Sequence, residues 1–95
     1  MQRDRKKLQP IHIAIGERLR ELRIAAGYSS YETFAFMHDI SRSNYSRYEN
    51  GHNMQLDTFI YLLTCLDISF ADFFKDFDAA PSGIYPVIAP PPSRV

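Results

Sequence analysis

The chain has 95 residues, of which 45% are apolar, 23% charged and 14% aromatic, and these values are typical of one small globular domain. No apolar run approaches the roughly 18 residues of a membrane span, and no secretory signal is expected, because no apolar stretch with a small-residue cleavage site follows the basic start. The single cysteine, Cys65, excludes an internal disulfide, so we expect a reducing, cytoplasmic location.

The charges are balanced overall but not along the chain. Residues 1–50 hold nine bases and six acids, and residues 51–95 hold two bases and five acids, so the halves carry +3 and −3. A polyanion such as nucleic acid would meet the first half favourably. Half-chains of this charge are also common in proteins that bind no polyanion, so the asymmetry alone is weak support.

Residues 1–10 form a basic segment that ends at Pro10 and is expected to be a flexible arm. The apolar spacing then becomes helical over residues 11–26, where four apolar side chains recur at i, i+4, i+7 and i+11: Ile15, Leu19, Leu22 and Ala26. Gly27 is the expected stop for this helix, because glycine readily takes the left-handed conformation that follows a helix end.

A pair of short helices is predicted next, over residues 31–38 and 42–49. Ser29 and Glu32 match a capping box for the first helix, with Ser30 as a competing cap one residue later. Its inward side chains are expected to be Phe34, Ala35 and Met37. Ser41 is the expected N-cap of the second helix, which ends at Asn50–Gly51, and the turn between them tolerates Asp39 in the left-handed conformation.

Two further helices are predicted before the composition changes. Residues 56–66 are apolar on nearly every face, which predicts the most buried helix of the fold. Ser69 is the expected cap of a helix over residues 70–77 that carries four phenylalanines. Residues 78–95 contain five of the six prolines and are expected to be an extended or disordered tail, so residues 11–77 form the predicted domain.

Two short, tightly joined helices within a five-helix chain are typical of a helix-turn-helix unit. Four segments carry a more specific pattern: IGERLRELRIAAG (15–27), ETFA (32–35), ISRSNYSRYENG (40–51) and LDTFIYLLTCLDISFADFF (56–74). In this order they resemble the lambda-repressor/Cro-like helix-turn-helix domains, the Xre family, over about two-thirds of the chain. The resemblance implies an all-α, compact five-helix fold with a Pro-rich C-terminal tail.

The helix over residues 42–49 is the candidate reading helix. Tyr45 and Tyr48 share one face and are expected to pack inward, which leaves long donors and small polar groups on the other face. An arginine can bind guanine O6 and N7 in the major groove, with about 1–3 kcal/mol of discrimination. The resemblance implies base contacts at Arg42, Ser43 and Arg47, with Asn44 and Ser46 as helpers. The alternative is an ordinary solvated helix face.

Phosphate contacts are expected on either side of this helix. The resemblance implies five candidates: Ser30, Tyr31, Ser41, His52 and Asn53. Tyr31 stands where the family usually has a glutamine, so it either donates its hydroxyl to a phosphate or only packs. The resemblance also implies that Arg23 and Glu49 form a structural ion pair that orients the reading helix; the alternative is two independent surface charges. The basic arm either follows the DNA or only improves solubility.

No residue pattern for catalysis, a cofactor or a metal is found in the sequence. The three histidines are dispersed, there is one cysteine, and no Gly-rich phosphate loop occurs. We therefore expect no enzyme but a sequence-specific regulator of double-stranded DNA, a repressor and homodimer that uses the last helix and the tail. The residues expected at that dimer surface are Phe73, Phe74, Ile84 and Tyr85. The alternative is a protein-binding module, such as an antitoxin-like protein, whose tail binds a partner.

Overall fold

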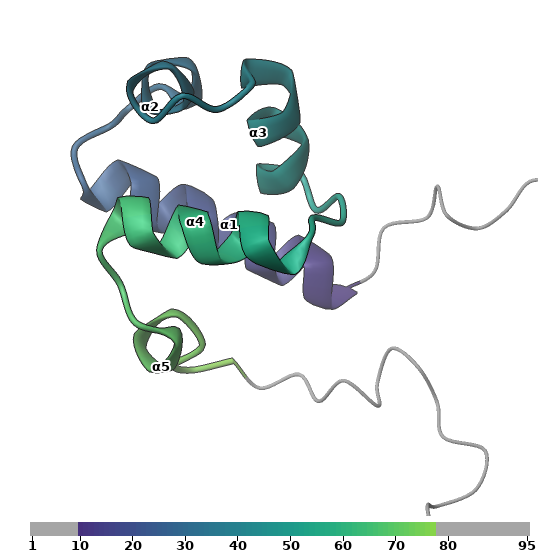
Figure 1. Ribbon diagram of the computed structural model, residues 1–95. Coiled ribbons are helices and arrows are strands. Elements are labelled where there is room, and N and C mark those ends of the chain that lie inside the picture. Colours follow the sequence, from purple (N-terminus) through teal and green to yellow (C-terminus); the bar gives the residue numbers. More distant parts are fainter. Residues whose placement is uncertain (1–9, 78–95) are drawn as a thin grey trace, which may run out of the picture.

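The computed structural model describes residues 10–77, which form five helices joined by short turns (Figure 1). The helices are α1 (Pro10–Ala25), α2 (Tyr31–Met37), α3 (Arg42–Glu49), α4 (Leu56–Leu66) and α5 (Phe70–Phe73). No strand occurs between residues 10 and 77, so the predicted all-α class is confirmed. No helix within this range is long and apolar enough to cross a bilayer. The expected arm, apart from Pro10, and the expected tail over 78–95 lie outside the described residues.

The helices are arranged around α1 and α4, which run through the middle of the domain (Figure 1). The pair α2–α3 lies on one side of them and α5 on the other (Figure 1). Every helix contributes to one apolar core, whose buried members are Leu19, Phe34, Ala35, Tyr45, Phe59, Leu62, Leu63 and Phe73. α3 is therefore attached to the core through Tyr45, and its opposite face is left outside.

Serine caps fix where α2 and α3 begin. The Ser30 hydroxyl accepts hydrogen bonds from the backbone N–H of Glu32 and Thr33, at 3.1 and 3.2 Å. Ser30, which the sequence offered as the competing cap, is thus the N-cap, and the capping box suggested from Ser29 is wrong by one residue. Ser41 caps α3 as predicted, by accepting from the N–H of Asn44 at 3.3 Å. These bonds satisfy donors that a helix start leaves unpaired.

Left-handed residues close the turns on either side of the α2–α3 pair. Gly27 has φ of 101° after α1, and Gly51 has φ of 95° after α3. Asp39 has φ of 59° between α2 and α3, as the sequence predicted for a short polar side chain at that turn. The helix-turn-helix connection therefore needs no glycine at its centre.

Several predicted inward positions proved to be exposed. Met37 is 60% exposed, because α2 ends there and only its Phe34–Ala35 edge meets the core. α4, predicted as the most buried helix, buries Phe59, Leu62 and Leu63, but apolar side chains on its other face are exposed: Leu56 is 70%, Ile60 43% and Tyr61 45% exposed. With only 68 described residues around it, the domain has too few elements to cover both faces of α4.

The last helix is shorter than the sequence suggested. α5 ends at Phe73 rather than at residue 77, and the chain continues as a turn in which Asp76 has φ of 70°. The backbone N–H of Lys75 and Phe77 bond to carbonyls three residues back, which is the tight turn pattern. Arg18 of α1 donates to the carbonyls of Asp72 and Phe73, at 2.9 and 3.0 Å, so α1 fixes this end of α5.

Candidate nucleic-acid interface

The outer face of α3 is polar and free of large apolar side chains. Arg42, Ser43, Asn44 and Arg47 are exposed, whereas Tyr45 is fully buried on the opposite side. Among residues 10–77, neither guanidinium has an ion-pair or hydrogen-bond partner. Two exposed arginines with unused donors therefore stand on this two-turn helix, one at its start and one in its last turn.

The serines of α3 are partly engaged within the helix. The hydroxyls of Ser41 and Ser43 lie 3.3 Å apart, so one of them donates to the other. Asn50 donates from Nδ2 to the Ser46 carbonyl at 2.9 Å, and its distance to the Ser46 hydroxyl is 3.5 Å. Ser46 is half-buried and lies closer to the domain than the two arginines do.

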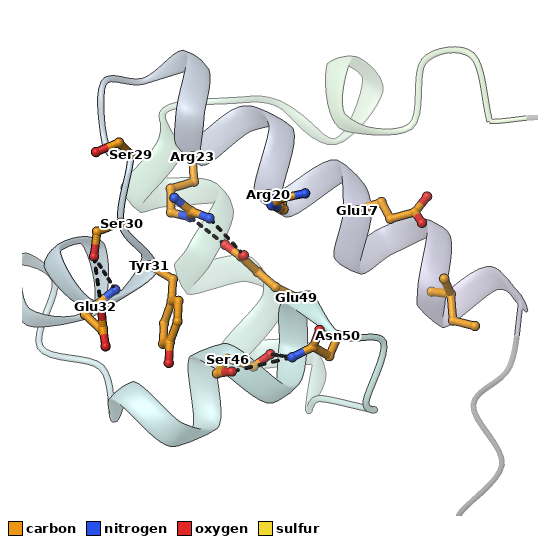
Figure 2. Close-up of a pocket in the computed structure, with 11 residues that line it drawn as sticks. Glu17, Arg20, Arg23, Ser29, Ser30, Tyr31, Glu32, Ser46, Glu49 and Asn50 are labelled. Carbon is orange, nitrogen blue, oxygen red and sulfur yellow. Dashed lines mark hydrogen bonds and ion pairs between the residues drawn. The ribbon is translucent and has the colours of Figure 1, made fainter.

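A buried ion pair joins α1 to the end of α3. Arg23 donates from Nε to Glu49 Oε2 at 2.7 Å and from Nη2 to Oε1 at 3.1 Å, and Figure 2 shows this two-bond contact. The two side chains are only 4% and 9% exposed. Nη1 donates to the Tyr28 carbonyl at 2.7 Å, and the hydrogen bonds to Glu49 raise the pKa of the guanidinium. The pair therefore acts inside the domain, not on its surface.

Gly16 sets the distance between α1 and α3, and the sequence reasoning missed it. A Cβ atom at this position would lie 2.5 Å from the Glu49 carbonyl oxygen and 2.7 Å from that of Tyr48. Both atoms belong to the backbone of α3, so they have no freedom to rotate away. A glycine inside a helical pattern often marks a close contact with another element, and this is the sequence feature that could have identified Gly16. The pair and the glycine together position Glu49.

The Tyr45 hydroxyl is buried beside this ion pair and has no hydrogen-bond partner within residues 10–77. Burial raises the pKa of Tyr45 far above its usual value, and the negative charge of Glu49 adds to the rise. Tyr45 is therefore a neutral part of the core and not a group that reaches DNA. Its ring packs against Phe34, with ring centroids 5.0 Å apart.

A hollow of about 570 Å³ lies between α1, the start of α2 and the inner edge of α3. Ser30 and Tyr31 line it together with Ser46, and Figure 2 shows the Tyr31 side chain pointing from α2 toward Ser46. The structure thus brings two candidate phosphate contacts next to one candidate base contact. Arg20 also lines the hollow and is exposed, although the sequence reasoning did not select it. Arg20 lies three residues before Arg23, on a neighbouring part of the same helix face, and this spacing is the sequence feature that could have identified it.

The remaining candidates lie elsewhere around α3. Arg42 lines a separate depression with Phe36 and Ile40, at the start of the helix. His52 and Asn53 follow the helix and line an apolar groove on another side of the domain. The candidate phosphate contacts are therefore divided between the two ends of α3. Within residues 10–77, no three His, Cys, Asp or Glu side chains are placed to hold a metal ion.

Comparison with known proteins points to one family. The family model described as "Helix-turn-helix" matches residues 19–73. A similar solved structure is the high-resolution crystal structure of the restriction-modification controller protein C.AhdI from Aeromonas hydrophila. It is 40% identical to this chain and has a TM-score of 0.60, and the match covers 67% of this chain and 97% of that chain. No curated protein gives a significant sequence match.

Proposed function

Because this chain belongs to the helix-turn-helix family of DNA-binding transcription regulators, in its lambda-repressor/Cro-like (Xre) branch, we propose that it is a repressor that reads the major groove with α3. The observation that carries the proposal is that Arg42 and Arg47 are both exposed and have no ion-pair or hydrogen-bond partner among residues 10–77. In this family the start of the second helix of the unit contacts base edges. We assign base contacts to Arg42, Ser43 and Arg47, with Asn44 and Ser46 beside them.

We assign backbone contacts to residues around α3. Ser30 and Tyr31 border the hollow next to Ser46. Ser41 lies at the N-cap of α3, and His52 and Asn53 lie in the loop that follows the helix. Arg20 is added to this set, because an arginine exposed on the hollow can neutralise a phosphate. Contacts of this kind set the register of the protein on the duplex and carry no base information.

The regulator acts as a homodimer on a two-fold site in this proposal. The reading helices of such dimers lie about 34 Å apart, which is one turn of DNA. The surface offered to the second copy is the exposed apolar side of α4, where Ile60 is 43% and Tyr61 45% exposed. Phe74, which the sequence placed at the dimer surface, lines an apolar groove instead. Phe73, which the sequence placed on this surface, is fully buried and cannot take part.

Selection of binding sites from random duplex DNA tests the proposal. We expect a palindromic site, and we expect Arg42→Ala and Arg47→Ala each to weaken binding and to relax the base preference at one position per half-site, by about 1–3 kcal/mol. Lys75→Ala is the matched control, because it also removes one exposed positive charge but lies beyond α5. Unselective binding, or equal losses in all three variants, would contradict the assignment.

The repressor role needs its own measurement. A reporter promoter that overlaps the selected site should lose transcription when the chain is expressed, and Arg42→Ala with Arg47→Ala should restore it. An increase of transcription would instead make the protein an activator at that site.

A second candidate function is a protein-binding module, such as an antitoxin-like protein. The favouring observation is that Phe36 and Met37 of α2 are 83% and 60% exposed. Such a module would bind a partner protein with the same affinity in the wild type and in the Arg42→Ala, Arg47→Ala variant, and would give no palindrome in the selection.

A further inference from the structure

An apolar groove of about 360 Å³ lies on the side of the domain formed by α1, the α3–α4 loop, α4 and α5. Its wall consists of six apolar side chains: Ile15, Met54, Leu56, Phe59, Phe70 and Phe74. Two histidines, His12 and His52, stand among them, and no other lining residue is ionisable. Clefts of about 300–1,000 Å³ bury ligands of drug size, so this groove is large enough for a short peptide segment.

The wall of the groove is unusually exposed for apolar side chains. Leu56 is 70% exposed and Phe70 53%, although Phe59 between them is 9% exposed. The rings of Phe59 and Phe70 are 6.2 Å apart and those of Phe59 and Phe74 are 5.8 Å apart, so the groove has an ordered aromatic floor. Contiguous exposed apolar surface of this kind commonly marks a site that another segment covers.

We propose that residues 84–88 of the same chain, Ile84-Tyr85-Pro86-Val87-Ile88, occupy this groove. Four of these five residues are large and apolar, in a C-terminal stretch (78–95) whose only charged side chains are Asp78 and Arg94. An uncharged apolar segment suits a wall that lacks carboxylates, lysines and arginines. Residues 1–9 are a poorer occupant, because they hold four bases. Proline also favours the extended conformation that fits a groove.

The chain is long enough to make this contact within one molecule. Phe77, the last described residue, packs on Phe74 with ring centroids 5.1 Å apart, and Phe74 is itself part of the groove wall. Six residues separate Phe77 from Ile84, and such a segment spans up to about 25 Å when extended. Pro81 and Gly83 are residues that allow the chain to reverse its direction.

The solved relative has no counterpart for part of this chain. The match takes in 97% of that protein but only 67% of this one, so about a third of this chain has no counterpart in the match. The inference does not rest on the proposed DNA-binding function. If it holds, the segment also contacts the loop that follows α3, because His52, Asn53 and Met54 of that loop line the groove.

The absence of tryptophan from the chain gives a direct test on the full-length protein. Tyr85→Trp introduces the sole indole inside the segment, and Ser93→Trp is the control that places it outside. We expect the indole of Tyr85→Trp to emit at shorter wavelength and to be quenched about tenfold less by iodide, the result for a segment bound by about 1.4 kcal/mol. Emission and quenching equal to those of the control would overturn the proposal.

A second substitution ties the signal to the groove. Leu56→Glu, made in the Tyr85→Trp background, should return quenching to the control value, whereas Ile24→Glu should leave it low, because Ile24 is 48% exposed on α1 and does not line the groove. Both positions are exposed, and a carboxylate in the first turn of α4 is favourable for the helix, so folding is expected to be retained. Unchanged quenching in Leu56→Glu would overturn the groove assignment. Protection that appears only as protein concentration rises would mean that the groove of a second copy is filled, and would overturn binding within one molecule.

Discussion

At the scale of single residues, the buried pair of Arg23 and Glu49 fixes the end of α3 against α1. Its three hydrogen bonds, counting the one to the Tyr28 carbonyl, lie between 2.7 and 3.1 Å. A buried pair gains from such bonds and loses strongly when one member is removed. Its effect on function is indirect, because Glu49 belongs to α3 while its charge stays inside the domain.

We expect Glu49→Gln to lower the free energy of unfolding by about 2 kcal/mol, because it weakens hydrogen bonds that involve charged groups. DNA affinity should fall as well, because the orientation of α3 is less fixed. Urea unfolding and gel-shift titration measure the two effects. Glu21→Gln is the matched control: it breaks the exposed pair of Arg18 and Glu21 (3.8 Å) and should cost less than about 1 kcal/mol. Equal stability and affinity in both variants would contradict a role for the buried pair.

The raised pKa of Tyr45 predicts a loss of stability in alkali. Below about pH 10 the phenol is protonated in both states, and above it only the unfolded chain releases the proton, so the free energy of unfolding falls by about 1.4 kcal/mol per pH unit. Tyr45→Phe should remove this component and change stability at pH 7 by less than about 1 kcal/mol, because the hydroxyl has no partner within residues 10–77. Unfolding curves from pH 8 to about 11.5 test it, and parallel declines in both proteins would contradict it.

At the scale of helices, the close approach of α1 and α3 at Gly16 predicts that Gly16→Ala destabilises the protein. Alanine normally stabilises a helix interior by up to about 1 kcal/mol. Here the added Cβ would meet two α3 carbonyl oxygens within 2.7 Å, so Gly16→Ala should instead cost about 1–3 kcal/mol and displace α3. Thermal unfolding together with the chemical shifts of α3 measures both. A rise in melting temperature would show that the helices separate freely.

The helix-turn-helix unit was largely predictable from local sequence. Ser41 and Gly51 mark the ends of α3, and Asp39 at the turn was expected to take the left-handed form that it has. The error at the start of α2 arose because Ser29 and Ser30 both satisfy a capping pattern, and only the path of the chain after Gly27 selects between them.

The later helices were less predictable, because apolar residues alone do not indicate which neighbouring elements will bury them. Four phenylalanines suggested a helix to residue 77, yet α5 is held by Arg18 bonds from a distant part of the sequence and stops after four residues. The sequence pattern did not single out Gly16 or Arg20 either, because their contacts depend on how α1 lies against α3 and α2. The burial of only one face of α4 likewise depends on the number of neighbouring helices, and the spacing of apolar residues along one helix does not reveal that number.

At the scale of the whole molecule, the proposed dimer predicts separate effects on assembly and on DNA binding. Ile60→Glu should shift the protein toward monomer, because a charge on the apolar side of α4 is costly to bury between two copies. Binding to a full two-fold site should weaken much more than binding to a half-site. Sedimentation velocity and gel-shift titration measure these changes. Phe36→Glu is the control on α2, and an equal shift toward monomer there would contradict the proposed surface.

The outer face of α3 has one more consequence, which concerns how such a protein changes over evolutionary time. Arg42, Ser43 and Arg47 are exposed and are absent from the buried core, while Gly16 and Arg23 hold the helix from behind. Exchanges on the outer face should therefore alter which operator is preferred at almost no loss of folding, since exposed substitutions rarely change stability by more than about 0.5 kcal/mol. One scaffold can in this way diverge toward new target genes by a handful of point mutations.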